Sequence, residues 1–100
     1  MSLETEFEQA LEGTVDAAKK RGYVPTYFMQ MLAEYGGVGT AKRLLAKSEP
    51  QEGLFELWRL NLLYESMEAV VVQEKHQSLF TKDEVAEAHR RLKELGYFKK

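Results

Sequence analysis

The feature that most constrains the fold is a helical spacing of apolar residues that glycine and proline interrupt repeatedly. Between residues 3 and 21, apolar side chains recur every three or four positions and carboxylates occupy the opposite face, which predicts an amphipathic helix. Gly22 is the expected stop, because glycine readily adopts the left-handed conformation that closes many helices. The apolar stripe consists of Leu3, Phe7, Leu11, Val15 and Ala18.

The next part of the chain repeats this pattern in shorter segments. Pro25 suits the first turn of a second helix, and Gly36-Gly37 ends that helix. A third helix is predicted for residues 38–47. The loop at residues 48–53 then leads to a fourth helix, which Asn61 breaks.

The run at residues 69–72 is β-branched, and its propensity alone would permit a short strand. No second convincing strand exists to pair with it, so a buried helix is predicted there. The last helix has the clearest boundaries, because Thr81 and Glu84 form a capping box and Gly96 closes the helix. Its inward stripe consists of Val85, Ala88, Leu92 and Leu95.

These segments predict one domain over residues 1–100, with an amphipathic N-terminal helix at 1–21 and a helical core at 22–97. The predicted fold class is all-α, a compact orthogonal bundle of five or six short helices. The absence of cysteine excludes disulfides and thiolate metal sites. The start of the chain has no signal-peptide pattern, and no apolar run approaches the ~20 residues that span a bilayer. A cytoplasmic protein without membrane contact is therefore expected.

Patterns for catalysis and metal binding are weak. The two histidines, His76 and His89, have no histidine or carboxylate partner three or four positions away. A partly buried structural role is expected for His89, which borders the apolar stripe of the last helix. The serines lie in no nucleophile elbow. Residues 36–42 lack the spacing of a phosphate-binding loop, although their backbone amides could receive an anion. We therefore expect no enzyme activity, no metal and no cofactor.

Glu68 is unusual because it lies next to the apolar run at residues 69–72. A buried carboxylate needs a partner, and Arg59 is the candidate for a structural ion pair. The functional alternative is a general acid with a raised pKa.

The net charge of −2 hides an uneven distribution of charge. Residues 1–18 carry five acidic and no basic side chains, whereas residues 19–100 carry a net charge of +3. Interleaved tyrosines and cations are typical of nucleic-acid surfaces, which combine stacking with phosphate contacts. The alternative is that the cations complement helix C-termini and the tyrosines rim the core. The candidate nucleic-acid-binding residues are Lys42, Arg43, Lys47, Arg90, Arg91, Lys93 and Tyr27.

Several short motifs occur in a characteristic order, from Gly22-Tyr23-Val24-Pro25-Thr26 through Gly36-Gly37 and Leu57-Trp58 to Leu79-Phe80-Thr81 and the segment 91–97. Over residues 20–97 the chain resembles a family of small, uncharacterised bacterial helical proteins. The resemblance implies no catalytic residues. Related segments occur beside restriction-type nuclease domains, which implies a nucleic-acid or defence context. Relatives carry Gly-Arg-Leu-Asp-Leu after the tryptophan, whereas this chain has Arg59-Leu60-Asn61-Leu62-Leu63 there and lacks the acidic residue.

Two functional hypotheses follow. The first is a non-enzymatic, nucleic-acid-associated or defence-system accessory module that contacts DNA or RNA through a basic helical face. The second is a protein-interaction domain, acting as a homodimer or docking on a larger partner. Its contacts would come from the apolar stripe of the first helix and from the C-terminal aromatic tail. These interaction residues are Leu3, Phe7, Leu11, Val15, Tyr97 and Phe98.

Overall fold

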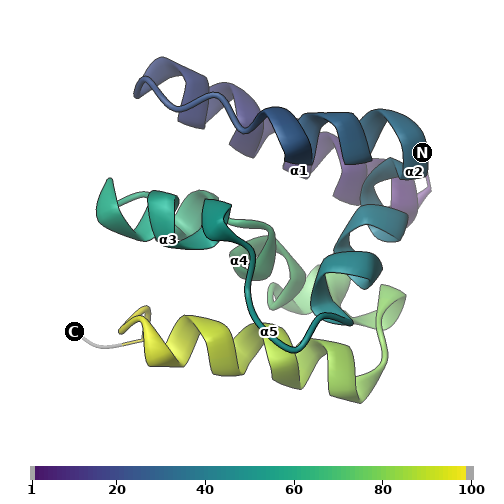
Figure 1. Ribbon diagram of the computed structural model, residues 1–100. Helices are drawn as coiled ribbons and strands as arrows, with labels where there is room; N and C mark the ends of the chain where they lie inside the picture. The colour runs from purple at the N-terminus through teal and green to yellow at the C-terminus, as the bar shows by residue number, and fades with distance from the viewer. Residues whose placement is uncertain (1, 99–100) are drawn as a thin grey trace.

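The computed structural model describes residues 2–98, which form five α-helices and two short 3₁₀ segments (Figure 1). The α-helices are α1 (Leu3–Lys20), α2 (Thr26–Leu45), α3 (Glu52–Arg59), α4 (Met67–Val71) and α5 (Lys82–Glu94), and the 3₁₀ segments are η1 (Leu63–Glu65) and η2 (Glu74–Leu79). No strand occurs among the described residues, so the all-α prediction is confirmed. None of these helices has the length and hydropathy needed to cross a bilayer.

Three helices end with the same backbone motif. Gly22, Asn61 and Gly96 have φ angles of 88°, 61° and 81°, in the left-handed region. At each end, the following N–H donates to the carbonyl five residues earlier, which satisfies a carbonyl that the helix leaves free. These bonds are Tyr23 to Ala18 at 2.9 Å, Leu62 to Leu57 at 2.7 Å and Tyr97 to Leu92 at 3.0 Å. The three predicted stops are confirmed.

Helix α2 turns sharply at Gly36, whose φ of 74° and ψ of 179° are not helical (Figure 1). Its second half begins at Gly37, where the backbone N–H donates to Oε1 of Glu8 on α1 over 2.8 Å. A Cβ at Gly37 would lie 2.8 Å from the Cα of Glu8, so only glycine allows this close approach. The predicted break at Gly36-Gly37 is therefore confirmed, and the anion that these amides receive is the Glu8 carboxylate.

The apolar stripe of α1 points into the domain. Phe7 and Leu11 are completely buried, Val15 is buried as well, and only Leu3 at the start of the helix is half-buried. The ring of Phe7 packs edge-on against Phe80 with 5.1 Å between ring centroids. Most of the stripe is therefore unavailable for docking on a second chain, and that part of the interaction hypothesis is corrected. Helices α2 and α4 and both 3₁₀ segments pack against α1, so its apolar stripe forms part of the domain's own core.

A second, smaller core lies between α3 and the C-terminal half of α5. It consists of Leu54, Leu63, Ala69 and Leu92. Leu54 is the only buried residue of α3, so this helix packs on the rest of the domain through a narrow face. Helix α4 lies between the two cores and is buried over its whole length, which confirms the predicted buried helix in this region. The capping box of Thr81 and Glu84 is also present at the start of α5.

Candidate functional site

Arg91 is the most deeply buried cation of the described chain, with a side chain that is 0% exposed. Its guanidinium donates to Glu87 over 2.6 Å and to Glu68 over 3.2 Å. It also donates to two backbone carbonyls, that of Leu44 in the last turn of α2 and that of Lys47 just after this helix. Arg91 therefore fixes the end of α2 to α5, and its placement on a basic face is wrong.

The same contacts correct the predicted ion pair of Glu68, whose partner is Arg91 and not Arg59. Arg59 pairs instead with Glu56 on its own helix. Burial raises the pKa of Glu68 above its usual range, against the opposing effects of its backbone hydrogen bond and of Arg91. The cost of burying the Glu68 carboxylate therefore exceeds the stabilisation that Arg91 gives to its anion.

Some of the remaining predicted cations are paired with carboxylates of the domain itself. Lys42 pairs with Glu84 over 2.8 Å, and Arg90 pairs with Glu87 and Glu94 over 2.6 and 2.7 Å. Two cations lie over exposed tyrosine rings, at 3.8 Å for Arg43 on Tyr35 and 5.7 Å for Lys47 on Tyr27. Lys93 is exposed and pairs with none of the described carboxylates.

The C-terminal tail folds back on α5. Tyr97 is half-buried against the second core, and Phe98 is 45% exposed. His89 is exposed and not partly buried as predicted, although the ring of Phe98 stacks on it with 4.2 Å between centroids. The buried histidine is His76, whose Nδ1 lies 2.9 Å from the carbonyl oxygen of Val70.

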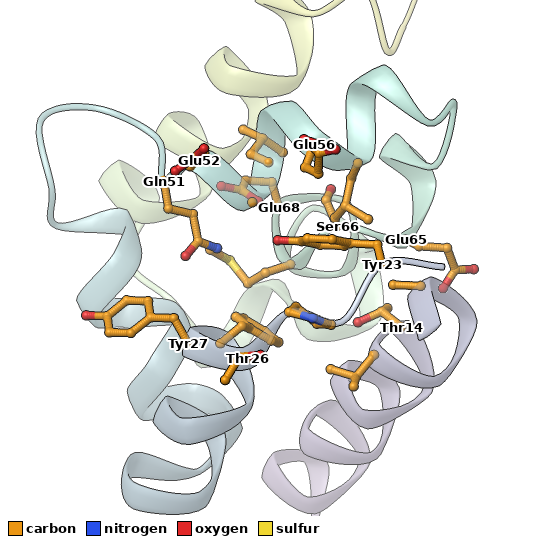
Figure 2. A pocket seen from close by; sticks show the side chains of 18 residues that line it. Thr14, Tyr23, Thr26, Tyr27, Gln51, Glu52, Glu56, Glu65, Ser66 and Glu68 are labelled. Atoms are coloured by element: carbon orange, nitrogen blue, oxygen red, sulfur yellow. The ribbon is translucent and has the colours of Figure 1, made fainter. Parts of the chain in front are cut away.

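A hollow of about 610 Å³ lies between the C-terminal end of α1, the start of α2, helix α3 and the η1–α4 segment (Figure 2). We call it the acidic pocket, because four glutamates and no lysine, arginine or histidine occur among its described lining residues. Hydroxyl groups and an amide supply further hydrogen-bonding atoms. The polar lining comprises Glu52, Glu56, Glu65, Glu68, Thr14, Tyr23, Thr26, Tyr27, Gln51 and Ser66.

The negative field of the acidic pocket acts on the phenol of Tyr23. Burial raises the pKa of Tyr23, and the charges of Glu56 and Glu52 raise it further. The phenol reaches α3 because residue 53 has no side chain, since a Cβ at Gly53 would lie 3.0 Å from the Tyr23 hydroxyl oxygen. Tyr23 therefore stays neutral and presents a hydrogen-bonding hydroxyl beside the carboxylates.

Two of the four glutamates are committed to arginines, Glu56 to Arg59 and Glu68 to Arg91. The carboxylates of Glu52 and Glu65 make no hydrogen bond or ion pair with any other residue in the described range 2–98. These two side chains leave the acidic pocket with uncompensated negative charge. Such a site can hold a cation or a hydrogen-bond donor, and it repels anions.

Sequence reasoning missed this pocket, because its lining comes from four separate segments. One signal was present. Residues 48–74 contain six glutamates and a single basic residue, Arg59.

Among residues 2–98, no group of three or more histidine, aspartate or glutamate side chains is arranged to hold a metal ion.

Comparisons of the chain with protein-family models, with curated proteins and with solved structures gave no match. The resemblance to a bacterial family therefore stays a prediction.

Proposed function

We propose that this protein is a non-enzymatic protein-interaction module whose acidic pocket receives a lysine or arginine side chain of a partner protein. The observation that carries the proposal is the charge of the acidic pocket, which has two unpaired glutamates, Glu52 and Glu65, and no basic residue among its described lining residues. Its volume of about 610 Å³ lies within the range of pockets that bury small ligands.

The pocket supplies two kinds of contact for a cation. Glu52 and Glu65 offer free carboxylates, and hydrogen bonds between carboxylates and cations are stronger than those between neutral groups. The ring of Tyr23 adds an aromatic face, on which ammonium and guanidinium groups bind favourably, whereas the ring of Tyr27 already has Lys47 over it. The apolar stem of a lysine or arginine would lie against Leu54, Leu57 and Met67, which also line the hollow.

The non-enzymatic part of the proposal is supported by how the reactive groups of the pocket are engaged. The Ser66 hydroxyl accepts the N–H of Ala69 over 3.1 Å as the cap of α4. Glu68 is held by Arg91 and no histidine occurs among the described lining residues, so Ser66 has no neighbouring imidazole base.

The nucleic-acid hypothesis stays a second candidate. It is supported by Arg43 and Lys47, which lie over Tyr35 and Tyr27 and pair with no carboxylate in the described part of the chain. It loses weight because Arg91 is buried and because Lys42 and Arg90 are already paired with glutamates.

A nuclear magnetic resonance titration with N-acetyl-arginine methylamide tests the proposal. We expect saturable shifts of the backbone amides around Tyr23, Gln51 and Glu65, and none with N-acetyl-glutamate methylamide. The double variant E52Q/E65Q should bind about tenfold more weakly, because each carboxylate contributes a charge-assisted hydrogen bond. The matched control is E49Q/E74Q, which removes two exposed glutamates outside the pocket and should bind as the wild type does. Equal binding by both double variants would overturn the proposal.

A further inference from the structure

A second hollow, of about 600 Å³, runs along the exposed side of α5 and shares no lining residue with the acidic pocket. Its floor is apolar and consists of Phe80, Val85 and Ala86. Its cations are Lys82, Arg90 and Lys93. No aspartate or glutamate occurs among the described side chains that line it. We call this hollow the α5 groove.

The spacing of these residues places them along one face of α5. Lys82, Ala86 and Lys93 are separated by four and seven positions, which is the repeat of a single helix face. At 1.5 Å per residue, Lys82 and Lys93 lie about 16 Å apart along the helix axis. The α5 groove is therefore elongated, with a lysine at each end.

The charges of the two lysines are not neutralised within the domain. Neither Lys82 nor Lys93 pairs with a carboxylate in the described range, whereas Arg90 is shared between Glu87 and Glu94. Lys82 is also the first residue of α5, where the helix dipole disfavours a cation. Helix-end electrostatics account for Lys93 near the C-terminus, but they do not account for Lys82.

We propose that the α5 groove binds an acidic amphipathic helix of a partner protein. The apolar face of that helix would cover Val85 and Ala86, and its carboxylates would meet Lys82 and Lys93. Charge complementarity selects this partner, because the α5 groove has free cations at its ends and no lining carboxylate.

Single-stranded nucleic acid fits the α5 groove less well. Phe80 is only 9% exposed, and Phe98 covers a face of the His89 ring, so the groove presents no open aromatic platform for bases. Its two free lysines would neutralise few phosphates, and few phosphate contacts give weak binding.

Fluorescence anisotropy with a labelled 18-residue helical peptide tests the inference. The peptide carries glutamates spaced to face Lys82 and Lys93 and an alanine–leucine stripe between them. We expect saturable binding by the full chain, and about tenfold weaker binding by K82E/K93E, since two attractive pairs become repulsive. The matched control is K19E/K20E, which reverses two exposed lysines at the end of α1 and should bind as the wild type does.

The same assay includes a glutamine version of the peptide and a labelled 20-mer of single-stranded DNA. Weaker binding of the glutamine peptide supports recognition by charge. Equal binding of both peptides, equal loss in both lysine variants, or tight binding of the DNA without binding of the acidic peptide would each overturn the inference. Loss of acidic-peptide binding in E52Q/E65Q, which leaves the α5 groove intact, would also contradict it.

Discussion

The acidic pocket and the α5 groove have nearly equal volumes, about 610 and 600 Å³, and opposite charges. The pocket lies between four segments of the chain, whereas the groove is built on α5 and the residues just before it. The difference shows that the charges of this domain are separated in space. A net charge of −2 therefore says little about either surface, because a ligand that suits one hollow is repelled by the other.

A chain of ion pairs runs through the protein from one hollow to the other. Glu68 lines the acidic pocket and pairs with buried Arg91. Arg91 also binds Glu87, and Glu87 binds Arg90, which lines the α5 groove. Glu68 and Arg91 are buried and Arg90 is exposed. The ion pair at the buried end therefore affects the free energy of unfolding more than the ion pair at the exposed end.

The largest expected effect on stability comes from removing Arg91, at the buried end of this series of ion pairs. Arg91→Met leaves the Glu68 carboxylate buried without a cation and removes the donor for the Leu44 and Lys47 carbonyls. We expect the free energy of unfolding in urea to fall by about 3–5 kcal/mol. Removing both charges with R91M/E68M should restore part of that loss. Arg90→Met, at the exposed end, should change stability much less, and an equal loss in R90M would contradict the contrast.

The next effect concerns Glu87, which lies between the two arginines. The hydrogen bond from Arg90 holds the pKa of Glu87 at about 2, below the reference value of 4.5. Because the folded-state pKa is lowered, Glu87 stabilises the fold above pH 4.5, and this contribution is lost as the pH falls from 4.5 to about 2. E87Q should therefore be less stable at neutral pH and less sensitive to acid over this range, as followed by circular dichroism. A wild-type acid response in E87Q would contradict this prediction.

Gly53→Ala should affect the acidic pocket and leave the α5 groove unchanged. A Cβ at residue 53 would lie 3.0 Å from the Tyr23 hydroxyl oxygen, so the phenol must move and the acidic pocket narrows. We expect weaker binding of the arginine derivative and unchanged binding of the acidic peptide. Alanine also favours the helix, so the free energy of unfolding should rise by up to about 1 kcal/mol unless displacement of Tyr23 offsets it. Unchanged arginine binding in a folded G53A would show that Tyr23 is not part of the site.

The smallest expected effect is at the start of α5. Lys82→Glu places a negative charge at the helix N-terminus, which should stabilise the fold by about 0.3–1 kcal/mol. The same substitution should weaken binding of the acidic peptide. Thermal unfolding and anisotropy measured on one sample would reveal opposite changes in stability and affinity. Parallel changes would mean that Lys82 has no role in the α5 groove.

Most of the fold could be predicted from the sequence, because its determinants are local. The left-handed stops at Gly22, Asn61 and Gly96 and the capping box at Thr81 depend on residues within one helical turn. The misplaced residues depend on contacts distant in sequence. Arg91 meets Glu68 across 23 positions, so a cation that looks exposed in a charged helix is instead buried.

The same distinction applies to the candidate sites. Arg90 and Lys93 are predicted from the sequence only as cations of a nucleic-acid face, and neither the α5 groove nor Lys82 is predicted. The acidic pocket depends on how α1, α2, α3 and α4 pack, which periodicity within one segment cannot show. The burial of Phe7 and Leu11 was ambiguous for a related reason, since a stripe packs equally well on its own domain or on another chain.

The bond between Glu8 and the Gly37 amide has a consequence for how the molecule opens. Helix α1 supplies the carboxylate that caps the start of the second half of α2, so local unfolding of α1 would also leave that helix start uncapped. Hydrogen exchange at the amides of residues 38–41 should therefore follow that of α1 as one cooperative unit. Removal of α1 would therefore destabilise the second half of α2 as well, because Gly37 would lose the carboxylate of Glu8 that accepts its N–H.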